Sequence, residues 1–178
     1  MSGVEAASLA TAVRAAAERI RAHVLATPLV GASWLSRELG ADVRLKLENV
    51  QTTGSFKLRG AVNALLQLPP ERRARGVVAA SSGNHGLAVA TAAKSLQVPA
   101  TVFVPTTTPA EKQAAIAAAG ASVQVHGDDC VVTEQHAREL AQASNRPYLS
   151  PYNDAAVGAG QGTGAVELLQ QWPDVDTI

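Results

Sequence analysis

Hydrophobic and polar positions follow a regular pattern from residue 76 to residue 150. Short apolar segments alternate with longer segments in which apolar residues recur every three or four positions. The short segments have the length of buried strands, and the longer ones have the period of amphipathic helices. This alternation predicts an α/β fold with an open parallel sheet flanked by helices. The expected strands are residues 77–80, 100–104, 122–125 and 148–150, and the expected helices are residues 86–96, 109–119 and 129–143.

The residues before this series have a less regular pattern. Apolar residues spaced by three and four between Leu9 and Val24 predict an amphipathic opening helix. Residues 32–39 predict a short helix that Gly40 closes. Residues 43–47 alternate apolar with charged side chains and predict a strand.

The residues after the series predict one more helix. Residues 154–172 have a helical pattern, although four glycines stand at alternate positions from 158 to 164. Glycine lowers helix stability, so these positions indicate close packing of backbones. Residues 175–178 resemble the start of another strand, and we therefore expect the chain to end inside an element.

Composition and charge exclude several classes of function. The 178 residues are 47% hydrophobic and 17% charged, which is typical of a globular protein with one domain or two small lobes. Fifteen basic and fifteen acidic residues cancel, and only 3% are aromatic, so neither nucleic acid nor a membrane is an expected partner. The single cysteine, Cys130, excludes an internal disulfide. We find no targeting pattern and expect a cytoplasmic protein.

Lys57 is the first candidate catalytic residue. It follows a turn that contains Gly54, and the helical spacing after it continues until Pro69 ends the run. Lys57 therefore lies in the first turn of a helix. The partial positive charge there disfavours an ammonium group and favours the neutral amine that reacts with carbonyl groups. A solvated surface lysine is the alternative.

The turn from Ser81 to Gly86 is the second candidate, because it joins the end of the first series strand to the helix that follows. Ligands in open α/β sheets bind at the carboxyl ends of strands. Free backbone N–H groups at the helix N-terminus, with two hydroxyls and one amide, suit a carboxylate or phosphate. The alternative is a turn whose polar side chains only cap the helix.

Other chemistries have weaker support in the sequence. Ser82 and His85 lack the surrounding pattern of a nucleophile elbow. Cys130, His126 and His136 lack a recognised ligand spacing, so no metal site is predicted. Residues 160–165 fit the loose G-x-G-x-x-A dinucleotide pattern. They do not directly follow a strand, however, and they lack the acidic partner of such sites.

Three segments together resemble one known family. They are residues 54–60, the turn of residues 81–86 and residues 159–163. The resemblance covers nearly the whole chain and is to the serine/threonine dehydratase and serine racemase group of fold type II pyridoxal-phosphate enzymes. Cysteine and threonine synthases typically have aspartate at the position of Leu58 and tend to have threonine at the position of His85. Both differences favour the dehydratase and racemase group.

The resemblance implies a cofactor, pyridoxal 5′-phosphate, and the residues that hold it. Lys57 would bind the cofactor as a Schiff base and then take the Cα proton of the substrate. Asn84 would hydrogen-bond the 3′-oxygen of the cofactor. Phe56 would pack against its ring.

The resemblance also implies how the substrate binds. The turn that contains Ser81, Ser82, Gly83 and His85 would bind the substrate carboxylate. Ser82 would in addition act as acid or base on the opposite face of the ring, which a racemase needs and a dehydratase does not. Asn153 would face the site. The implied reaction removes water from a serine- or threonine-type hydroxy amino acid and gives a 2-oxo acid and ammonia.

The same resemblance implies that the chain corresponds to about half of such an enzyme. Residues 1–75 would form the first part of a large domain, residues 76–149 a small α/β domain, and residues 150–178 a return segment of the large domain. The phosphate-binding loop of the family comes after the point where this chain stops. The full-length protein would be a homo-oligomer. A racemase, and a non-catalytic fragment or binding module, are the alternatives to a dehydratase.

Overall fold

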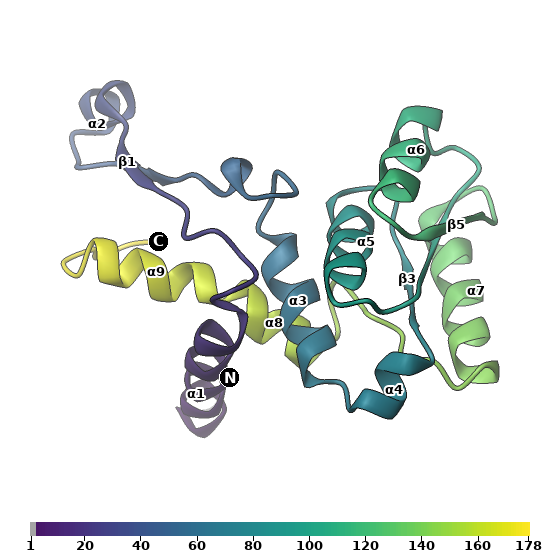
Figure 1. Ribbon diagram of the computed structural model, residues 1–178. Coiled ribbons are helices and arrows are strands. Elements are labelled where there is room, and N and C mark those ends of the chain that lie inside the picture. Colours follow the sequence, from purple (N-terminus) through teal and green to yellow (C-terminus); the bar gives the residue numbers. More distant parts are fainter. Residues whose placement is uncertain (1–2) are drawn as a thin grey trace.

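A computed structural model describes the backbone of residues 3–178 and the side chains of residues 7–178. Its centre is a parallel sheet of three strands in the order β3-β4-β5. Val77 pairs with Ala100, and Thr101 pairs with Ser122. Figure 1 shows α5 and α7 on opposite faces of this sheet. The elements are β3 (Val77–Ala80), α5 (Asn84–Ser95), β4 (Ala100–Val104), α6 (Ala110–Ala118), β5 (Ser122–Val125) and α7 (Cys130–Ala143).

The predicted α/β series is therefore confirmed, with one correction. Residues 148–150 were expected to form a fourth strand, but only Tyr148 joins the sheet, through a single parallel bridge to Val78. Leu149 donates its N–H to the carbonyl of Val78, and the chain then turns away from the sheet. This bridge consists of two hydrogen bonds, from Val78 N–H to the carbonyl of Pro147 and from Leu149 N–H to the carbonyl of Val78, and it does not extend into a ladder.

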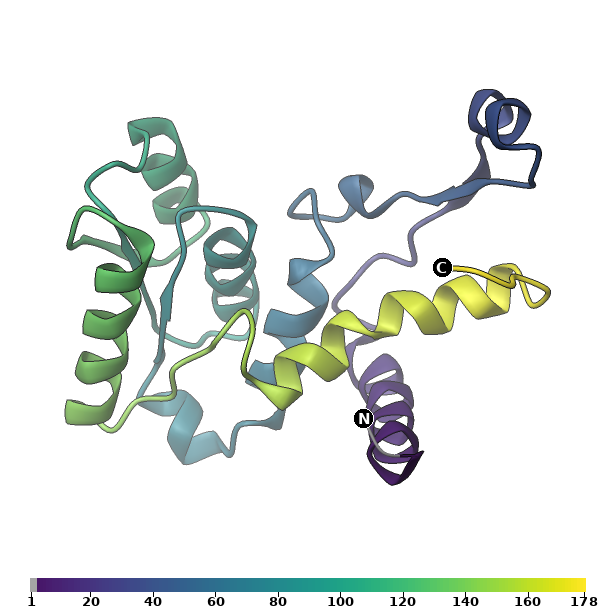
Figure 2. The ribbon, with the colours of Figure 1, turned by 180° about the vertical axis from the view of Figure 1, so that it is seen from behind.

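The N-terminal part of the chain forms a second group of elements. The strand predicted at residues 43–47 is present and pairs antiparallel with residues 29–31. The sequence pattern did not predict the strand at residues 29–31. Gly40 closes α2 in the left-handed conformation, at φ 63°, as expected for a glycine after a helix. Figures 1 and 2 show α2 and β1 projecting from the rest of the molecule. The elements are α1 (Gly3–Ile20), β1 (Leu29–Gly31), α2 (Ser33–Leu39), β2 (Arg44–Lys46), the 3-10 turn η1 (Glu48–Val50), α3 (Lys57–Gln67) and α4 (Pro70–Ala74).

The C-terminal part returns to α3. The predicted helix of residues 154–172 is present as two helices, α8 (Ala155–Gln161) and α9 (Thr163–Gln171), which meet at Gly162. Asp154 caps α8 by accepting hydrogen bonds from the N–H groups of Ala156 and Val157. Residues 175–178 do not form the expected strand.

One hydrophobic core connects α3 to the sheet. It contains Leu58 and Leu65 of α3, Val77 of β3, Val89 of α5 and Val102 of β4, all of them almost fully buried. Alanines fill the contact between α5 and its neighbours, so these helices approach closely. The helix that begins at Lys57 is thereby fixed against the carboxyl end of β3.

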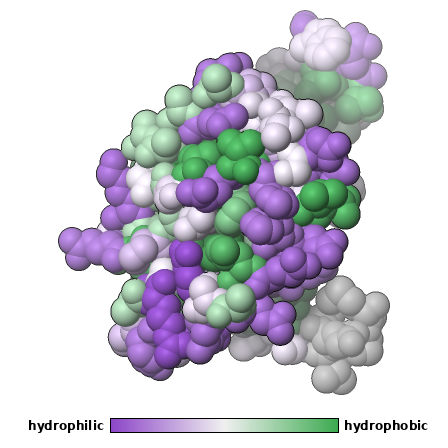
Figure 3. Space-filling model, turned by 90° about the vertical axis from the view of Figure 1, so that its right-hand side faces the viewer, coloured by the Kyte–Doolittle hydropathy of each residue, from purple (hydrophilic) through white to green (hydrophobic). Residues whose placement is uncertain are grey.

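The surface is mainly polar on the side that faces the viewer in Figure 3, where hydrophobic residues form separate patches among hydrophilic ones. Exposed apolar side chains of β5 and α7 include Val125 and Val131. Between residues 3 and 178, no helix has the length and apolar character needed to cross a membrane.

Candidate active site

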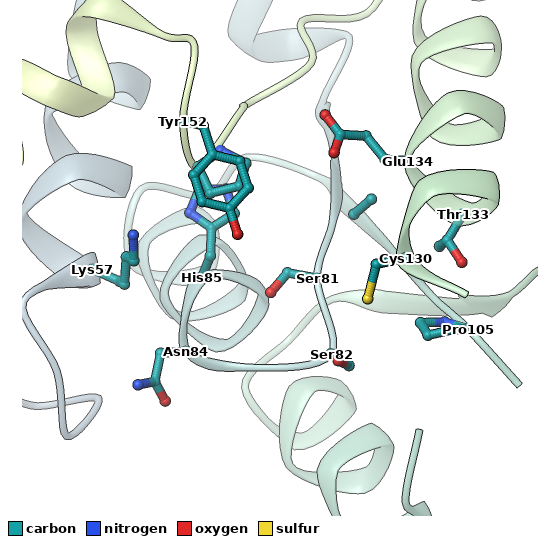
Figure 4. Close-up of a pocket in the computed structure, with 12 residues that line it drawn as sticks. Lys57, Ser81, Ser82, Asn84, His85, Pro105, Cys130, Thr133, Glu134 and Tyr152 are labelled. Atoms are coloured by element: carbon teal, nitrogen blue, oxygen red, sulfur yellow. The ribbon is translucent and has the colours of Figure 1, made fainter. Parts of the chain in front are cut away.

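A cavity of about 270 Å³ lies where α3, α5 and α7 meet the carboxyl end of β3. Figure 4 shows the side chains around it, with Lys57 on one side and Cys130 on the other. This is the edge of a parallel sheet at which ligands bind in α/β proteins. The cavity is lined by Lys57, Ala80, Ser81, Ser82, Asn84, His85, Pro105, Cys130, Thr133, Glu134, Pro151 and Tyr152.

Lys57 is the first residue of α3, as the sequence predicts. The preceding residue, Phe56, makes no side-chain capping bond to the helix. The Lys57 Nζ lies 4.9 Å from the centre of the Phe56 ring and 5.9 Å from the centre of the Tyr152 ring. Because it also lines the cavity, Lys57 is not a fully solvated surface lysine.

The turn before α5 provides unpaired donors at the cavity. Gly83 occupies the N-cap position of α5, and no side chain caps the helix. The Ser81 hydroxyl accepts from the N–H of Gly83, at 3.2 Å, rather than from the first turn of the helix. The first N–H groups of α5 therefore remain available to a ligand, since they have no partner within a helix. This geometry favours the anion-binding interpretation of the turn over capping alone.

Gly86 allows the turn to pass close to the sheet. A Cβ at this position would overlap the carbonyl oxygen of Ser81 and would lie 3.2 Å from side-chain carbons of Val102 and Ile116. Any larger residue would move the turn away from β4. Glycine at position 86 thus helps to place the hydroxyls and N–H groups at the cavity.

His85 is only 3% exposed and has one fixed hydrogen bond. Its Nε2 lies 3.0 Å from the carbonyl oxygen of Leu149, which can only accept, so Nε2 carries the hydrogen in the neutral ring. The Nδ1 atom is then a buried acceptor, and it has no partner in the described part of the chain. Burial lowers the pKa of His85, the bond to Leu149 opposes this effect, and the charge of Lys57 adds to it. We therefore assign a neutral ring to His85.

Five of the eight residues predicted from the sequence line the cavity, namely Lys57, Ser81, Ser82, Asn84 and His85. Phe56, Gly83 and Asn153 do not. The ring of Phe56 lies next to the Lys57 amine but does not line the cavity. Gly83 is the N-cap residue of α5 and contributes only backbone atoms to the turn. The N–H of Asn153 donates to the Ser150 hydroxyl, at 3.1 Å, and the neighbouring Tyr152 reaches the cavity instead.

The sequence pattern missed the contribution of α7. Asp129 caps this helix by accepting from the N–H groups of Val131 and Val132, and Cys130, Thr133 and Glu134 then line the cavity. A signal was present, because α7 follows β5 and its N-terminus must lie at the same edge of the sheet as that of α5. Tyr152 carried no such signal, since it lies in an irregular loop.

Comparison with solved structures shows the class of protein that has this fold. Threonine deaminase isoform 2 from Solanum lycopersicum superposes with a TM-score of 0.91 at 34% identity, over 98% of this chain and 48% of that chain. Serine racemase from Dictyostelium discoideum gives 0.87 at 36% identity, over 93% and 54%. The fold is that of the fold type II pyridoxal-phosphate enzymes.

The family follows from the sequence comparison. Residues 20–178 match the family model described as pyridoxal-phosphate dependent enzyme, and the chain belongs to this family. It is 42% identical over 163 residues to an L-threo-3-hydroxyaspartate ammonia-lyase of Saccharomyces cerevisiae, which covers 92% of this chain and 50% of that protein. The chain thus spans about half the length of the curated relatives that it matches.

The cavity residues fit the reactive end of pyridoxal phosphate. The cofactor carries an aldehyde that combines with a primary amine, and Lys57 would supply this amine, since its side chain lines the cavity. The amide of Asn84 can donate a hydrogen bond to a ring oxygen, and the buried Nδ1 of His85 is an acceptor that still lacks a partner. Lys57 and Asn84 are therefore the residues of this chain that would hold the group.

Proposed function

We propose that the full-length protein is a pyridoxal-phosphate dependent dehydratase, or ammonia-lyase, that removes water from serine- or threonine-type 3-hydroxy amino acids. The observation that carries this proposal is that the Lys57 amine and the N-terminal turn of α5 line one cavity. An amine and an anion-binding turn are the two features needed to bind a carbonyl cofactor beside an amino-acid carboxylate. The names of the relatives, ammonia-lyase and threonine deaminase, support the same reaction.

The chemistry divides between the cofactor and the residues of the cavity. Bound pyridoxal phosphate acts as an electron sink that makes the Cα proton of an amino acid acidic. The amine of Lys57 accepts this proton. The N–H groups at the start of α5 bind the carboxylate and so hold the Cα–H bond toward Lys57. The hydroxyl leaves the next carbon together with a proton as water, and the enamine that results takes up a water molecule and releases ammonia to give the 2-oxo acid.

Racemisation is the second candidate function, and Ser82 is the observation that favours it. Ser82 and Lys57 line the same cavity from different elements, Ser82 from the turn before α5 and Lys57 from the start of α3 (Figure 4). A racemase needs a base that removes the Cα proton from one face of the substrate and an acid that returns a proton on the other face, and a hydroxyl can provide the second group. Serine racemase is also among the structures with the same fold.

The complete protein tests both reactions in one assay. L-serine, L-threonine and L-threo-3-hydroxyaspartate are each incubated with enzyme and cofactor, and 2-oxo acid and ammonia are measured together with the chirality of the remaining amino acid. We expect 2-oxo acid and ammonia in equal amounts, and none from Lys57→Ala. Lys112→Ala is the matched control, because Lys112 is exposed on α6, away from the cavity. Product formation by Lys57→Ala at the normal rate would reject the proposal.

The assembly, location and domain division of the protein belong to the same proposal. Residues 1–75 and 150–178 form parts of a large domain around a small domain of residues 76–149, and the complete protein is a cytoplasmic homo-oligomer. The isolated residues 1–178 bind pyridoxal phosphate more weakly than the complete protein. Cofactor titration of both, with size-exclusion chromatography of the complete protein, tests these points. Equal affinity of the fragment would contradict the last of them, and cofactor binding without turnover by the complete protein would favour a binding module.

A further inference from the structure

Arg59 is a fully buried arginine in the first turn of α3, two residues after Lys57. Its guanidinium group binds two carboxylates, each through two hydrogen bonds. Nε and Nη2 donate to Glu48 at 2.9 and 2.8 Å. Nη1 and Nη2 donate to Glu167 at 2.7 and 2.9 Å. Bidentate pairs of this kind fix the orientation of an arginine as well as its position.

The two carboxylates are themselves held by other parts of the chain. Glu48 accepts from the Thr27 hydroxyl at 2.6 Å. Glu167 accepts from Lys46 Nζ at 2.7 Å, and Lys46 also donates to the carbonyl of Thr27 at 2.6 Å. Two positive and two negative side chains therefore form a closed network. It ties α3 to η1, to β2, to the loop before β1 and to α9.

The network lies on the opposite side of α3 from the cavity. Residues two apart in a helix point in nearly opposite directions, so Arg59 faces away from the side of α3 on which Lys57 lines the cavity. The start of α3 has no side-chain cap of its own. In the loop before it, the buried hydroxyls of Thr53 and Ser55 have no hydrogen-bond partner among the described residues. Arg59 is thus the polar anchor of the turn that carries Lys57.

We propose that Arg59, held between Glu48 and Glu167, is a positioning residue that keeps the first turn of α3 in place and so directs the Lys57 amine into the cavity. The inference rests on the proposed function for the role of Lys57. The anchoring of α3 by itself does not depend on that function. Lysine at position 59 would keep the charge but would lose the planar fork that binds both carboxylates.

The experiment uses the complete protein with Arg59→Lys and Glu167→Gln, and Arg21→Lys as the matched control. Arg21 pairs with Glu18 on the surface, where both side chains are about 80% exposed. Circular dichroism and the unfolding midpoint identify variants that are folded at the assay temperature. If Arg59→Lys does not fold, Glu167→Gln is judged by the same readouts.

Two readouts then separate anchoring from catalysis. Hydrogen exchange of a peptide spanning residues 55–66 reports the start of α3 without any cofactor. Borohydride trapping of pyridoxal phosphate, followed by peptide mass spectrometry, compares the trapping rate at Lys57 with the rates at Lys94 and Lys112. We expect exchange at least tenfold faster and trapping at Lys57 at least tenfold slower in both variants. Trapping at the other two lysines and all readouts of Arg21→Lys should remain unchanged.

The combined results show whether Arg59 anchors the start of α3 and whether this anchoring positions the Lys57 amine. Unchanged exchange in the folded variants would overturn the anchoring. Faster exchange with unchanged trapping at Lys57 would show that the network is structural only, and it would also overturn the proposal. If the unmodified protein itself shows no preferred trapping at Lys57, the proposed function fails, and the exchange measurement alone decides whether Arg59 anchors α3.

Discussion

The backbones of Gly60 and Gly160 are in direct contact, so that a Cβ on residue 160 would stand 2.8 Å from the Cα of Gly60. Gly60 belongs to α3 and Gly160 to α8. The same Cβ would overlap the carbonyl oxygen of Arg59. The helix that begins at Lys57 therefore packs on α8 backbone to backbone, and no side chain larger than hydrogen fits between them.

This contact predicts opposite effects of alanine at two glycines of α8. Gly160→Ala should lower the free energy of unfolding by about 1–3 kcal/mol, because the helices must separate. Gly158→Ala should raise it by about 0.5–1 kcal/mol, since nothing lies within 4 Å of its Cβ position and alanine favours a helix. Urea denaturation measures both. Similar midpoints for the two variants would contradict the close contact.

The neutral state of His85 predicts a loss of stability in acid. Its pKa in the folded protein lies below the ordinary value of 6.5, mainly because the ring is buried. The unfolded chain then binds a proton that the folded protein does not, so the free energy of unfolding falls as pH drops below about 6.5. His85→Gln, which can still donate to Leu149, should be less sensitive over this range. Parallel pH dependences of the two proteins would contradict a neutral His85.

The proposed role of Ser82 predicts that its substitution affects racemisation more than water elimination. Ser82→Ala should lower racemisation by about 10²–10⁴-fold, because it removes the second proposed proton-transfer group of the cavity. Water elimination needs the Lys57 side only, and it should fall by less than about tenfold, within the range of lost binding contacts. Chiral chromatography and a 2-oxo acid assay on the same samples measure both rates. A proportionate loss of both reactions would argue against a separate role for Ser82.

The position of Cys130 in the cavity wall predicts that a thiol reagent can block the cavity. Its thiol is exposed and lines the cavity that Lys57 also lines. Alkylation with N-ethylmaleimide should abolish cofactor trapping at Lys57, and bound pyridoxal phosphate should slow the alkylation. Cys130→Ser should retain trapping after the same treatment. Mass spectrometry locates the label, and full trapping in protein labelled at Cys130 would place this residue outside the site.

Local spacing explains which parts of the fold were predictable. The strands and helices between residues 76 and 143 follow from runs and periods of apolar residues, and the structure places them within a few residues of the predicted bounds. The prediction of a strand at residues 148–150 was wrong, because only Tyr148 pairs with the sheet, at Val78. Whether a segment at the edge of a sheet continues to pair depends on the path of the chain beyond it and not on local composition. The pairing of β1 with β2 was missed for a similar reason, since β1 is only three residues long.

The sequence by itself determined the chemistry available to this protein. It placed Lys57 at the start of a helix and a polar turn between a strand and α5, because both depend on residues that are neighbours in the chain. Only the tertiary structure decided which residues meet. Cys130 and Tyr152 reach the cavity, and Arg59 pairs with Glu167, through packing between distant segments that buries apolar side chains and leaves each buried charge with a partner.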